Sequence, residues 1–293
     1  MDKSANFNPW QAVLPTKEAI EESIPLMWHS GLQALLPSKS LSLLEKQKKK
    51  LSFDWAAVSA TFPSLSYDLY AYHWLIVNTR TFYYVSDTKS EKPLSHDDCL
   101  ALIPFADCFN HADVGCEVVF SPSGYTIYAD RDIEKGEEIY ISYGNHNNDF
   151  LLAEYGFILE ENKWDEICLD EVILPLFSEV QKQTLKDAGF LGNFVLDRVT
   201  VCYRTQVALR LLYMLPNRWL RLVARGLGDE DKHQVAVDQV LLQVLNSYLG
   251  TVHEKLNQVT VLDCGLPSQR NTLSRRWKQI RLLLITAIKR IEN

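Results

Sequence analysis

Apolar residues recur along this chain with a helical period in some stretches and with a strand period in others. In residues 1–66, prolines interrupt short apolar pieces, which predicts short helices joined by irregular segments. From Asp68 to Arg80, apolar side chains return every three or four positions, which predicts a helix with Asp68 as its candidate N-cap. The apolar face of this helix is predicted at Leu69, Tyr72, His73 and Ile76. A loop is predicted over the polar residues 86–98, which include Pro93.

The period shortens to that of β-strands beyond Leu102. Residues 116–120 and 125–129 are β-rich runs separated by Ser-Pro-Ser-Gly, a turn composition, so they predict a hairpin. The next alternating run, residues 138–143, predicts a strand after the turn at Lys135-Gly136. Its apolar face is predicted at Ile139 and Ile141.

A short helix is predicted directly after that strand. Asn148 stands where an N-cap would lie, and Gly156 is expected to end the helix. The apolar face of the helix is predicted at Leu151, Leu152 and Tyr155. Leu151, Leu152 and Phe157 are expected to pack against the preceding strand at Ile139 and Ile141.

Beyond Glu166 the pattern is helical to the C-terminus. One apolar stripe consists of Val237, Val240, Leu241, Val244, Leu245 and Tyr248. A second consists of Trp277, Ile280, Leu284, Ile288 and Ile291. Because such stripes need a partner surface, we expect a helical domain that packs on itself, with its boundary near residues 162–166. The predicted division is therefore an insert-like segment at 1–66, a β-containing part at 67–165 and a helical domain at 166–293.

Composition and charge narrow the classes of protein. A chain of 293 residues with 47% hydrophobic and 23% charged residues is typical of a globular protein, and a net charge of −7 argues against a nucleic-acid partner. The one basic run, residues 46–50, is more consistent with a solvated helix end than with a phosphate-binding patch. No apolar stretch reaches the ~18 residues of a membrane span, and residues 1–10 lack the apolar core of a signal peptide. We therefore expect an intracellular protein, cytoplasmic or nuclear, without a membrane partner.

The cysteines give no indication of a metal or disulfide framework. All six are scattered without a C-x-x-C pair, which favours neither a zinc knuckle nor a secreted disulfide fold. Asp107, Cys108 and His111 can be imagined as metal ligands, but no further ligands cluster with them in the sequence. No metal is expected.

Three sequence motifs follow one another within about fifty residues. They are D-C-F-N-H at 107–111, R-D-I-E-K-G-E-E-I-Y-I-S-Y-G at 131–144 and N-D-F-L-L-A-E-Y-G-F at 148–157. This series resembles the C-terminal half of a SET domain, the lysine methyltransferase fold. The helical domain resembles the one that follows SET in the RuBisCO large-subunit methyltransferase subfamily. The resemblance implies an α+β fold class: part of a SET-type β fold with a helical insert, followed by an all-helical C-terminal domain.

The resemblance also implies a site for S-adenosylmethionine. In the family, the tyrosine of S-Y-G faces the reacting centre, the asparagine and histidine of N-H hold the cofactor, and an arginine pairs with the cofactor carboxylate. Carried over to this chain, the catalytic positions are Tyr143 and Tyr155, and the cofactor-binding positions are Arg80, Asp107, Asn110 and His111.

The residues themselves leave other interpretations open. Tyr143 could be a buried strand tyrosine with a satisfied hydroxyl, and Arg80 could be a cation at a helix end. Asn110 and His111 could form a turn that caps neighbouring backbone. Residues 115–117 occupy a region where active relatives often place a tyrosine, so the lysine channel is expected to be reshaped.

The chain also departs from the family ahead of these motifs. A SET domain normally brings a G-x-G loop whose backbone approaches the cofactor closely, yet Gly31 is the one glycine before Gly115. The only G-x-G, residues 226–228, lies among the predicted C-terminal helices. The sequence is then an incomplete methyltransferase, a protein that binds S-adenosylmethionine differently, or a relative that has abandoned methyl transfer.

Three functions remain in view. The first is an S-adenosylmethionine-dependent protein-lysine N-methyltransferase, whose partner is a protein substrate with a target lysine. The second is a cofactor-independent cyclase or isomerase acting on a small apolar molecule, in a cavity lined by Trp28, Trp74, Tyr83 or Tyr84. The third is a catalytically inactive binding module.

Overall fold

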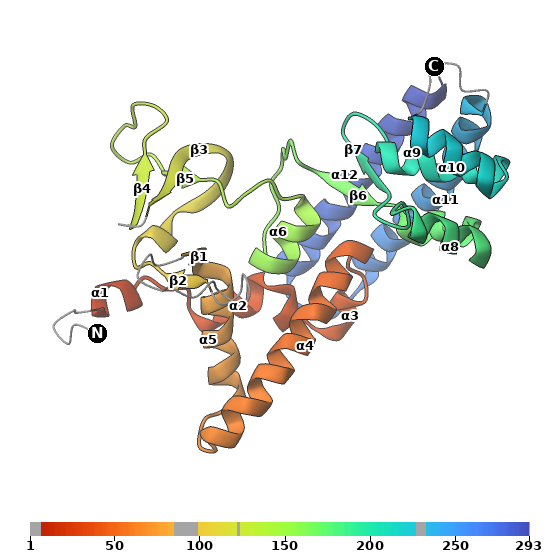
Figure 1. The fold of residues 1–293 in the computed structure, drawn as a ribbon. Coiled ribbons are helices and arrows are strands. Elements are labelled where there is room, and N and C mark those ends of the chain that lie inside the picture. Colours follow the sequence, from red (N-terminus) through yellow and green to blue (C-terminus); the bar gives the residue numbers. More distant parts are fainter. Residues whose placement is uncertain (1–6, 85–98, 122–123, 227–232, 293) are drawn as a thin grey trace. The chain divides into compact units, whose positions relative to one another are not determined.

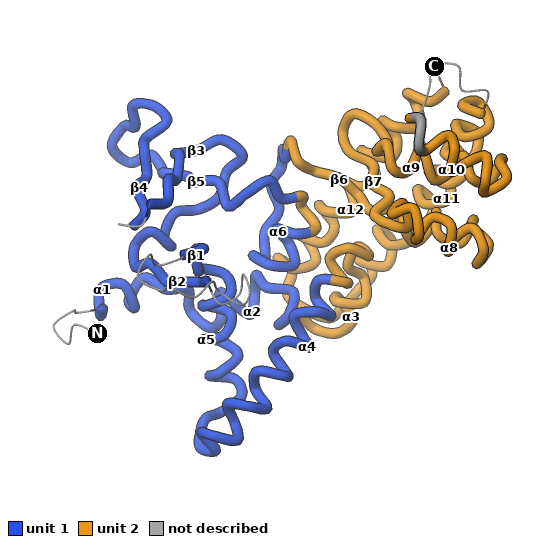
Figure 2. Tube along the Cα trace, in the orientation of Figure 1, with its two compact units in different colours: residues 1–27, 43–146, 150–162 blue, residues 28–42, 147–149, 163–293 orange. Residues whose placement is uncertain are grey.

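A computed structural model describes residues 7–84, 99–121, 124–226 and 233–292 (Figure 1). Contacts divide the chain into two compact units (Figure 2). Unit 1 comprises residues 1–27, 43–146 and 150–162, and unit 2 comprises 28–42, 147–149 and 163–293. The predicted loop at 86–98 lies outside the described residues, as do Pro122-Ser123 of the hairpin turn and Leu227-Gly228. The division at 1–66, 67–165 and 166–293 stays a prediction; residues 1–66 contribute to both units.

The N-terminal third of the chain is mainly helical. Its elements are α1 (Asn8–Gln11), α2 (Lys17–Ser23), the 3₁₀ helix η1 (Pro25–Met27), α3 (Ser30–Gln33), α4 (Ser38–Thr61) and α5 (Tyr67–Arg80). The basic run at 46–50 lies inside α4, so its prediction as a helix end is wrong. Within that run the Gln47 amide nitrogen donates to the Ala153 carbonyl at 3.1 Å and to Glu154 at 2.7 Å, so this turn of α4 packs against protein.

Helix α5 supplies the core of unit 1 and carries Arg80 at its end. Its N-cap is Ser66, whose hydroxyl accepts the Leu69 N–H at 3.3 Å, so the prediction of Asp68 as the cap is wrong. The predicted apolar face is also largely wrong, because Leu69 is 49% exposed. The buried residues of the helix are Ala71, Trp74, Leu75 and Ile76. They pack with Ile20, Ile24 and Leu51.

Two small sheets complete unit 1. Strand β1 (Thr81–Tyr83) pairs antiparallel with β2 (Leu100–Leu102). Strand β3 (Asn110–Ser121) pairs antiparallel with β4 (Gly124–Tyr128), which confirms the predicted hairpin. It also pairs in parallel with β5 (Tyr140–Ile141). The strand predicted at 138–143 thus has two paired residues.

The two isoleucines of that predicted strand do not share a buried face. Ile141 is 1% exposed, whereas Ile139 lies before the paired residues and is 38% exposed. No ladder imposes the strand alternation on Ile139, so its predicted core position is wrong. Leu151 and Leu152 are fully buried as expected, but Ile139 is not part of the buried core that was predicted to receive them.

The helix after β5 begins at Asn148 and ends at Tyr155 (α6, Asn148–Tyr155). Its first N–H, that of Asn148, donates to Asp165 at 3.1 Å, so Asn148 is not the outside cap that was predicted. Gly156 follows the helix with a φ of 78°. A Cβ at Gly156 would lie 2.6 Å from the Ser23 carbonyl oxygen, so both the backbone conformation and the close approach require glycine.

Unit 2 is built mainly from helices. They are α7 (Asp170–Ile173), η4 (Leu174–Leu176), α8 (Glu179–Asp187), α9 (Tyr203–Arg210), η5 (Leu211–Tyr213), α10 (Pro216–Arg225), α11 (Gln234–Val261) and α12 (Pro267–Glu292). The two predicted stripes are buried on α11 and α12, which pack together, except that Val240 and Ile291 are half-buried. The expectation of an all-helical domain is wrong, because β6 (Glu166–Cys168) pairs with β7 (Val195–Asp197). None of the helices that the structure describes combines the length and apolarity needed to cross a membrane.

Candidate active site

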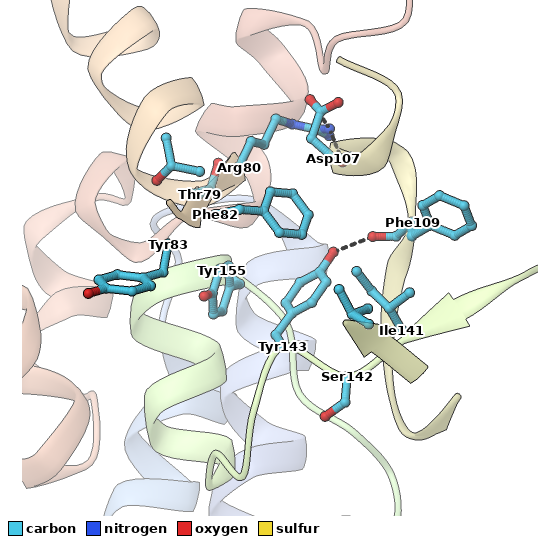
Figure 3. Close-up of a pocket in the computed structure, with 12 residues that line it drawn as sticks. Thr79, Arg80, Phe82, Tyr83, Asp107, Phe109, Ile141, Ser142, Tyr143 and Tyr155 are labelled. Carbon is cyan, nitrogen blue, oxygen red and sulfur yellow. Dashed lines mark hydrogen bonds and ion pairs between the residues drawn. The ribbon is translucent and has the colours of Figure 1, made fainter. Parts of the chain in front are cut away.

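Two cavities in unit 1 share a wall formed by Thr79, Arg80, Asp107, Tyr143 and Tyr155. The first, here called the aromatic cavity, has a volume of about 190 Å³ and is also lined by Phe82, Tyr83, Phe109 and Ser142 (Figure 3). The second, here called the α2 cavity, has a volume of about 310 Å³ and is also lined by residues of α2, by Asn110 and by Phe157. Five of the six predicted site residues therefore line one or both cavities.

Tyr143 stands in the shared wall, directly after β5. Its hydroxyl donates to the Phe109 carbonyl oxygen at 2.6 Å (Figure 3). Its ring stacks on His111, with centroids 5.1 Å apart, and lies 5.1 Å from the ring of Tyr155. Burial raises the pKa of Tyr143 to about 12, so the hydroxyl keeps its proton at neutral pH. Tyr143 is thus a buried tyrosine with a satisfied hydroxyl that also lines both cavities, and its catalytic role stays a prediction.

His111 holds the backbone of Tyr143 in place. Its Nδ1 accepts the Tyr143 N–H at 3.1 Å, which puts the imidazole proton on Nε2. Burial lowers the pKa of His111 below its ordinary value, so the ring is neutral. Nε2 is buried and has no hydrogen-bond partner among the residues that the structure describes. His111 lines neither cavity, so its cofactor-binding role stays a prediction.

Asn110 begins β3 and lines the α2 cavity. Its amide nitrogen donates to Glu138 at 2.5 Å, and Glu138 also accepts the Tyr140 hydroxyl at 2.7 Å. Asn110 is exposed, so its side chain can exchange this partner for a ligand. The alternative of a side chain that caps backbone holds for His111, whose ring accepts a backbone N–H, and not for Asn110, whose amide donates to a side chain.

Arg80 and Asp107 form an ion pair next to both cavities (Figure 3). Nη1 of Arg80 donates to the Asp107 carbonyl oxygen at 2.6 Å and lies 3.3 Å from Oδ2. Asp107 is in the 3₁₀ turn η3 (Ala106–Cys108), two residues before the Phe109 carbonyl that holds Tyr143. In the described part of the chain, Nε and Nη2 of Arg80 have no hydrogen-bond partner. A guanidinium edge with free donors is suited to a carboxylate.

The contact of Trp10 with Asp107 was not predicted from the sequence. The indole N–H of Trp10 donates to both carboxylate oxygens of Asp107, at 2.9 and 3.0 Å. Trp10 is a single tryptophan beside Pro9, and no spacing rule connects it to a residue 97 positions away. Because no local pattern encodes this pairing, only the folded chain reveals it.

The region of residues 115–117, where a family tyrosine was expected, has a backbone constraint. The β3 register against β5 shifts between His111 and Cys116. A Cβ at Gly115 would lie 2.6 Å from the Tyr140 carbonyl oxygen. Position 115 therefore accepts no side chain unless β3 and β5 separate.

The aromatic residues considered for a small-molecule cavity have different surroundings. Tyr83 lines the aromatic cavity, and Tyr84 packs edge-on against Phe120. Trp74 lines a different cavity, beside Asp54, while Trp28 belongs to unit 2. Within the described residues, no group of three or more His, Cys, Asp or Glu side chains is arranged to hold a metal ion.

Comparison with known proteins gives two family matches and several relatives. The family model described as SET domain matches residues 11–144, and the one described as Ribosomal lysine N-methyltransferase 2 C-terminal domain matches 165–289. Ribosomal lysine N-methyltransferase set11 of Schizosaccharomyces pombe is 30% identical over 246 residues, which are 80% of this chain and 62% of that protein. Ribosomal lysine N-methyltransferase 2 of Saccharomyces cerevisiae is 25% identical over 303 residues, 87% of this chain and 62% of that protein. The chain thus spans less than two thirds of either relative.

Solved structures agree with the fold. The structure of Rubisco LSMT bound to AdoMet matches with a TM-score of 0.62 and 16% identity, covering 98% of this chain and 70% of that chain. The complex of Rubisco LSMT with sinefungin and monomethyllysine gives a TM-score of 0.60 at 16% identity, covering 99% and 71%. At this identity the likeness establishes the fold, which is the predicted SET-type α+β architecture.

Proposed function

The chain belongs to the SET-domain lysine methyltransferase family, and from that premise we propose that it is an S-adenosylmethionine-dependent protein-lysine N-methyltransferase. One observation carries the proposal: a buried, neutral tyrosine hydroxyl in the wall shared by two cavities. A methyl transfer from sulfur to nitrogen is an in-line displacement, which needs two reactants brought to one point from opposite sides. Two cavities with a common wall supply that arrangement.

The α2 cavity suits the cofactor. Arg80 offers a guanidinium edge without a partner among the described residues for the amino-acid carboxylate, and Asn110 offers an amide donor in the same wall. These residues fit the amino-acid part of S-adenosylmethionine, which would supply an electrophilic methyl group on a sulfonium. The carried-over cofactor roles of Arg80, Asp107, Asn110 and His111 are part of this proposal.

The aromatic cavity suits the lysine side chain. Phe82, Tyr83 and Tyr155 present rings to the apolar stem of a lysine, and ring faces attract an ammonium group on arrival. The amine must lose its proton before it can attack. Burial in such a cavity favours the neutral amine, because desolvation disfavours the charged form.

Tyr143 then orients the amine without acting as a base. The Tyr143 hydroxyl donates its hydrogen bond to the Phe109 carbonyl, so its oxygen remains available to accept a hydrogen bond from an amine N–H. Accepting that N–H turns the nitrogen lone pair towards the methyl group. A pKa of about 12 keeps the hydroxyl neutral throughout, so the contribution of Tyr143 is a fixed dipole.

We propose ribosomal proteins as the substrate class, because two relatives are named ribosomal lysine N-methyltransferases. The protein would then act in the cytoplasm or the nucleus. Purified ribosomal proteins are incubated with the chain and methyl-deuterated S-adenosylmethionine, and lysine Nζ methylation is mapped by mass spectrometry. Deuterated lysines made by the parent and absent with Tyr143→Phe support the proposal. Cofactor binding without any labelled lysine would reject the substrate class.

The cofactor-independent cyclase or isomerase is not favoured. It required an apolar cavity lined by Trp28, Trp74, Tyr83 or Tyr84, and the cavity that Tyr83 lines also contains the charged pair Arg80 and Asp107. No observation on the described residues singles out an inactive binding module either.

A further inference from the structure

Trp10 lies just outside residues 11–144, the segment matched by the SET-domain family model. It is part of the four-residue helix α1, and its indole N–H reaches both oxygens of Asp107, at 2.9 Å from Oδ1 and 3.0 Å from Oδ2. The Asp107 side chain is 0% exposed. A residue beyond the matched segment thus contacts a buried carboxylate in the wall of both cavities.

Trp10 and Arg80 both donate to the Asp107 carboxylate: the indole N–H lies within reach of both oxygens, and Arg80 within reach of Oδ2 alone. Arg80 Nη1 is 3.3 Å from Oδ2, and its shorter hydrogen bond, at 2.6 Å, goes to the Asp107 backbone carbonyl. Oδ1 receives the indole N–H and otherwise a weak contact from the Cys108 thiol at 3.9 Å. A buried carboxylate oxygen without a donor is costly, because nothing replaces its lost hydration. The indole therefore satisfies the oxygen that Arg80 does not reach.

One edge of the Arg80 guanidinium is available to a ligand. Arg80 engages Asp107 through Nη1 alone, and Nε and Nη2 have no partner within the described residues. Two adjacent N–H donors on one guanidinium edge bind a carboxylate bidentately. We propose that Trp10 is a positioning residue: by holding Asp107, it keeps the Nε–Nη2 edge of Arg80 free for the carboxylate of S-adenosylmethionine. The inference rests on the proposed function, which supplies that ligand.

Removing the indole N–H has a directed consequence. Asp107 would then hold a buried oxygen whose remaining contact is the weak one from the Cys108 thiol, and a guanidinium reaches both oxygens of a carboxylate by turning its fork onto them. The Nε–Nη2 edge of Arg80 would then no longer be available to the ligand carboxylate. Contacts to the adenosine part of the ligand do not involve this edge and would remain.

The test compares two ligands on two variants. S-adenosylhomocysteine carries the amino-acid carboxylate, and 5′-methylthioadenosine shares the adenosine and thioether but lacks it. Trp10→Phe should weaken S-adenosylhomocysteine roughly tenfold, the effect of losing one hydrogen bond to a charged group, and should change methylthioadenosine by less than about twofold. Trp55→Phe is the matched control, because Trp55 packs on the Tyr67 and Tyr70 rings and has no hydrogen bond to the site.

Each outcome of the titrations decides a different point. Equal weakening of both ligands by Trp10→Phe would show a general structural effect and overturn the positioning role, as would unchanged affinity for both. If the parent chain binds neither ligand, the proposed function fails and the inference fails with it.

A second measurement needs no substitution and serves if Trp10→Phe does not fold. The indole N–H signals of the seven tryptophans are followed by nuclear magnetic resonance in the parent chain. S-adenosylhomocysteine should shift one indole signal that methylthioadenosine leaves in place, because only the first ligand carries the carboxylate that binds Arg80, next to Trp10. Identical spectra with the two ligands would overturn the inference.

Discussion

The surroundings of Tyr143 determine what its hydroxyl can do. The proton is directed to the Phe109 carbonyl at 2.6 Å, and the ring is held against His111. Burial raises the pKa to about 12, which excludes a phenolate at neutral pH. The remaining property is an oriented oxygen acceptor, and a fixed acceptor is what an attacking amine needs to present its lone pair.

Replacing Tyr143 by phenylalanine isolates that property. The ring and its packing stay, so cofactor affinity should change little, while turnover should fall on the order of 10²-fold or more, because a preorganised polar contact of the transition state is lost. Initial rates of methyl transfer and a parallel ligand titration measure the two effects. Tyr203→Phe is the control, since Tyr203 is 56% exposed in unit 2. Equal turnover of the parent and Tyr143→Phe would refute the assigned role.

The same residue predicts a pH dependence of stability. Tyr143 titrates near its ordinary value of 10.0 when unfolded and near 12 when folded, so between these values the unfolded chain binds fewer protons. The free energy of unfolding should therefore fall as pH rises from about 10 to about 12, more steeply for the parent than for Tyr143→Phe. Denaturant titrations across this range test the difference. Parallel curves for the two proteins would show that Tyr143 is not buried as described.

Sequence predicted the residues of this site better than it predicted their partners. The D-C-F-N-H and S-Y-G motifs brought Asp107, Asn110 and Tyr143 together in advance, and the fold agrees with that grouping. Their chemical roles stay predictions. The indole of Trp10 was beyond reach, because a hydrogen bond across 97 residues leaves no trace in local spacing.

At the scale of elements, the approach of β3 to β5 positions the site. Tyr143 is the second residue after the end of β5, and Asn110 and His111 begin β3. The parallel pairing of the two strands therefore brings the two motifs side by side. Gly115 permits that pairing, because any side chain there would meet the Tyr140 carbonyl.

Substituting that glycine should harm both stability and activity. Gly115→Ala puts a methyl group 2.6 Å from a backbone oxygen, so β5 must move, and we expect a loss of roughly 1–3 kcal/mol, as for other overpacked sites. Gly250→Ala is the opposite control: a Cβ there meets nothing within 4 Å, and replacing a helical glycine should stabilise by about 0.5–1 kcal/mol. Thermal melts of both variants measure the contrast. A Gly115→Ala melt equal to that of the parent would contradict the close approach.

The sequence predicted the elements correctly where apolar residues repeat with the helical period over many turns. The stripes of α11 and α12 are buried largely as their spacing indicated. It failed on α5, where Leu69 satisfied the helical spacing and yet lies 49% exposed. The strand predicted at 138–143 is longer than β5, because alternation in a sequence carries no information on how many residues pair with a neighbouring strand.

At the scale of the molecule, unit 2 is stabilised by a buried charge cluster. Arg276 of α12 is fully buried and donates to Asp149 and Asp165, at 2.7 Å each. Desolvation disfavours its charge, but the two carboxylates outweigh that effect and raise the pKa of Arg276 further above its ordinary value. These partners lie 127 and 111 residues away in sequence, so no motif announced them.

Breaking this cluster should be among the most destabilising single changes in unit 2. Arg276→Met leaves two buried carboxylates without their cation, and removal of one partner from such a pair costs about 3–5 kcal/mol. Arg281→Met on the same helix is the control, because Arg281 is half-buried and forms no ion pair within the described residues. Urea unfolding followed by circular dichroism compares the variants. Equal midpoints for the two variants would mean that the cluster contributes nothing.

The measurement that tests the central claim most directly is a calorimetric titration of the parent chain with S-adenosylhomocysteine, the demethylated product of the cofactor. We predict saturable binding of one ligand per chain, weakened in Asn110→Ala and nearly unchanged in Tyr143→Phe. Asn110 stands in the wall of the α2 cavity, whereas the proposed partner of the Tyr143 hydroxyl is the amine. Absence of binding at millimolar ligand would contradict the claim that this chain is an S-adenosylmethionine-dependent methyltransferase.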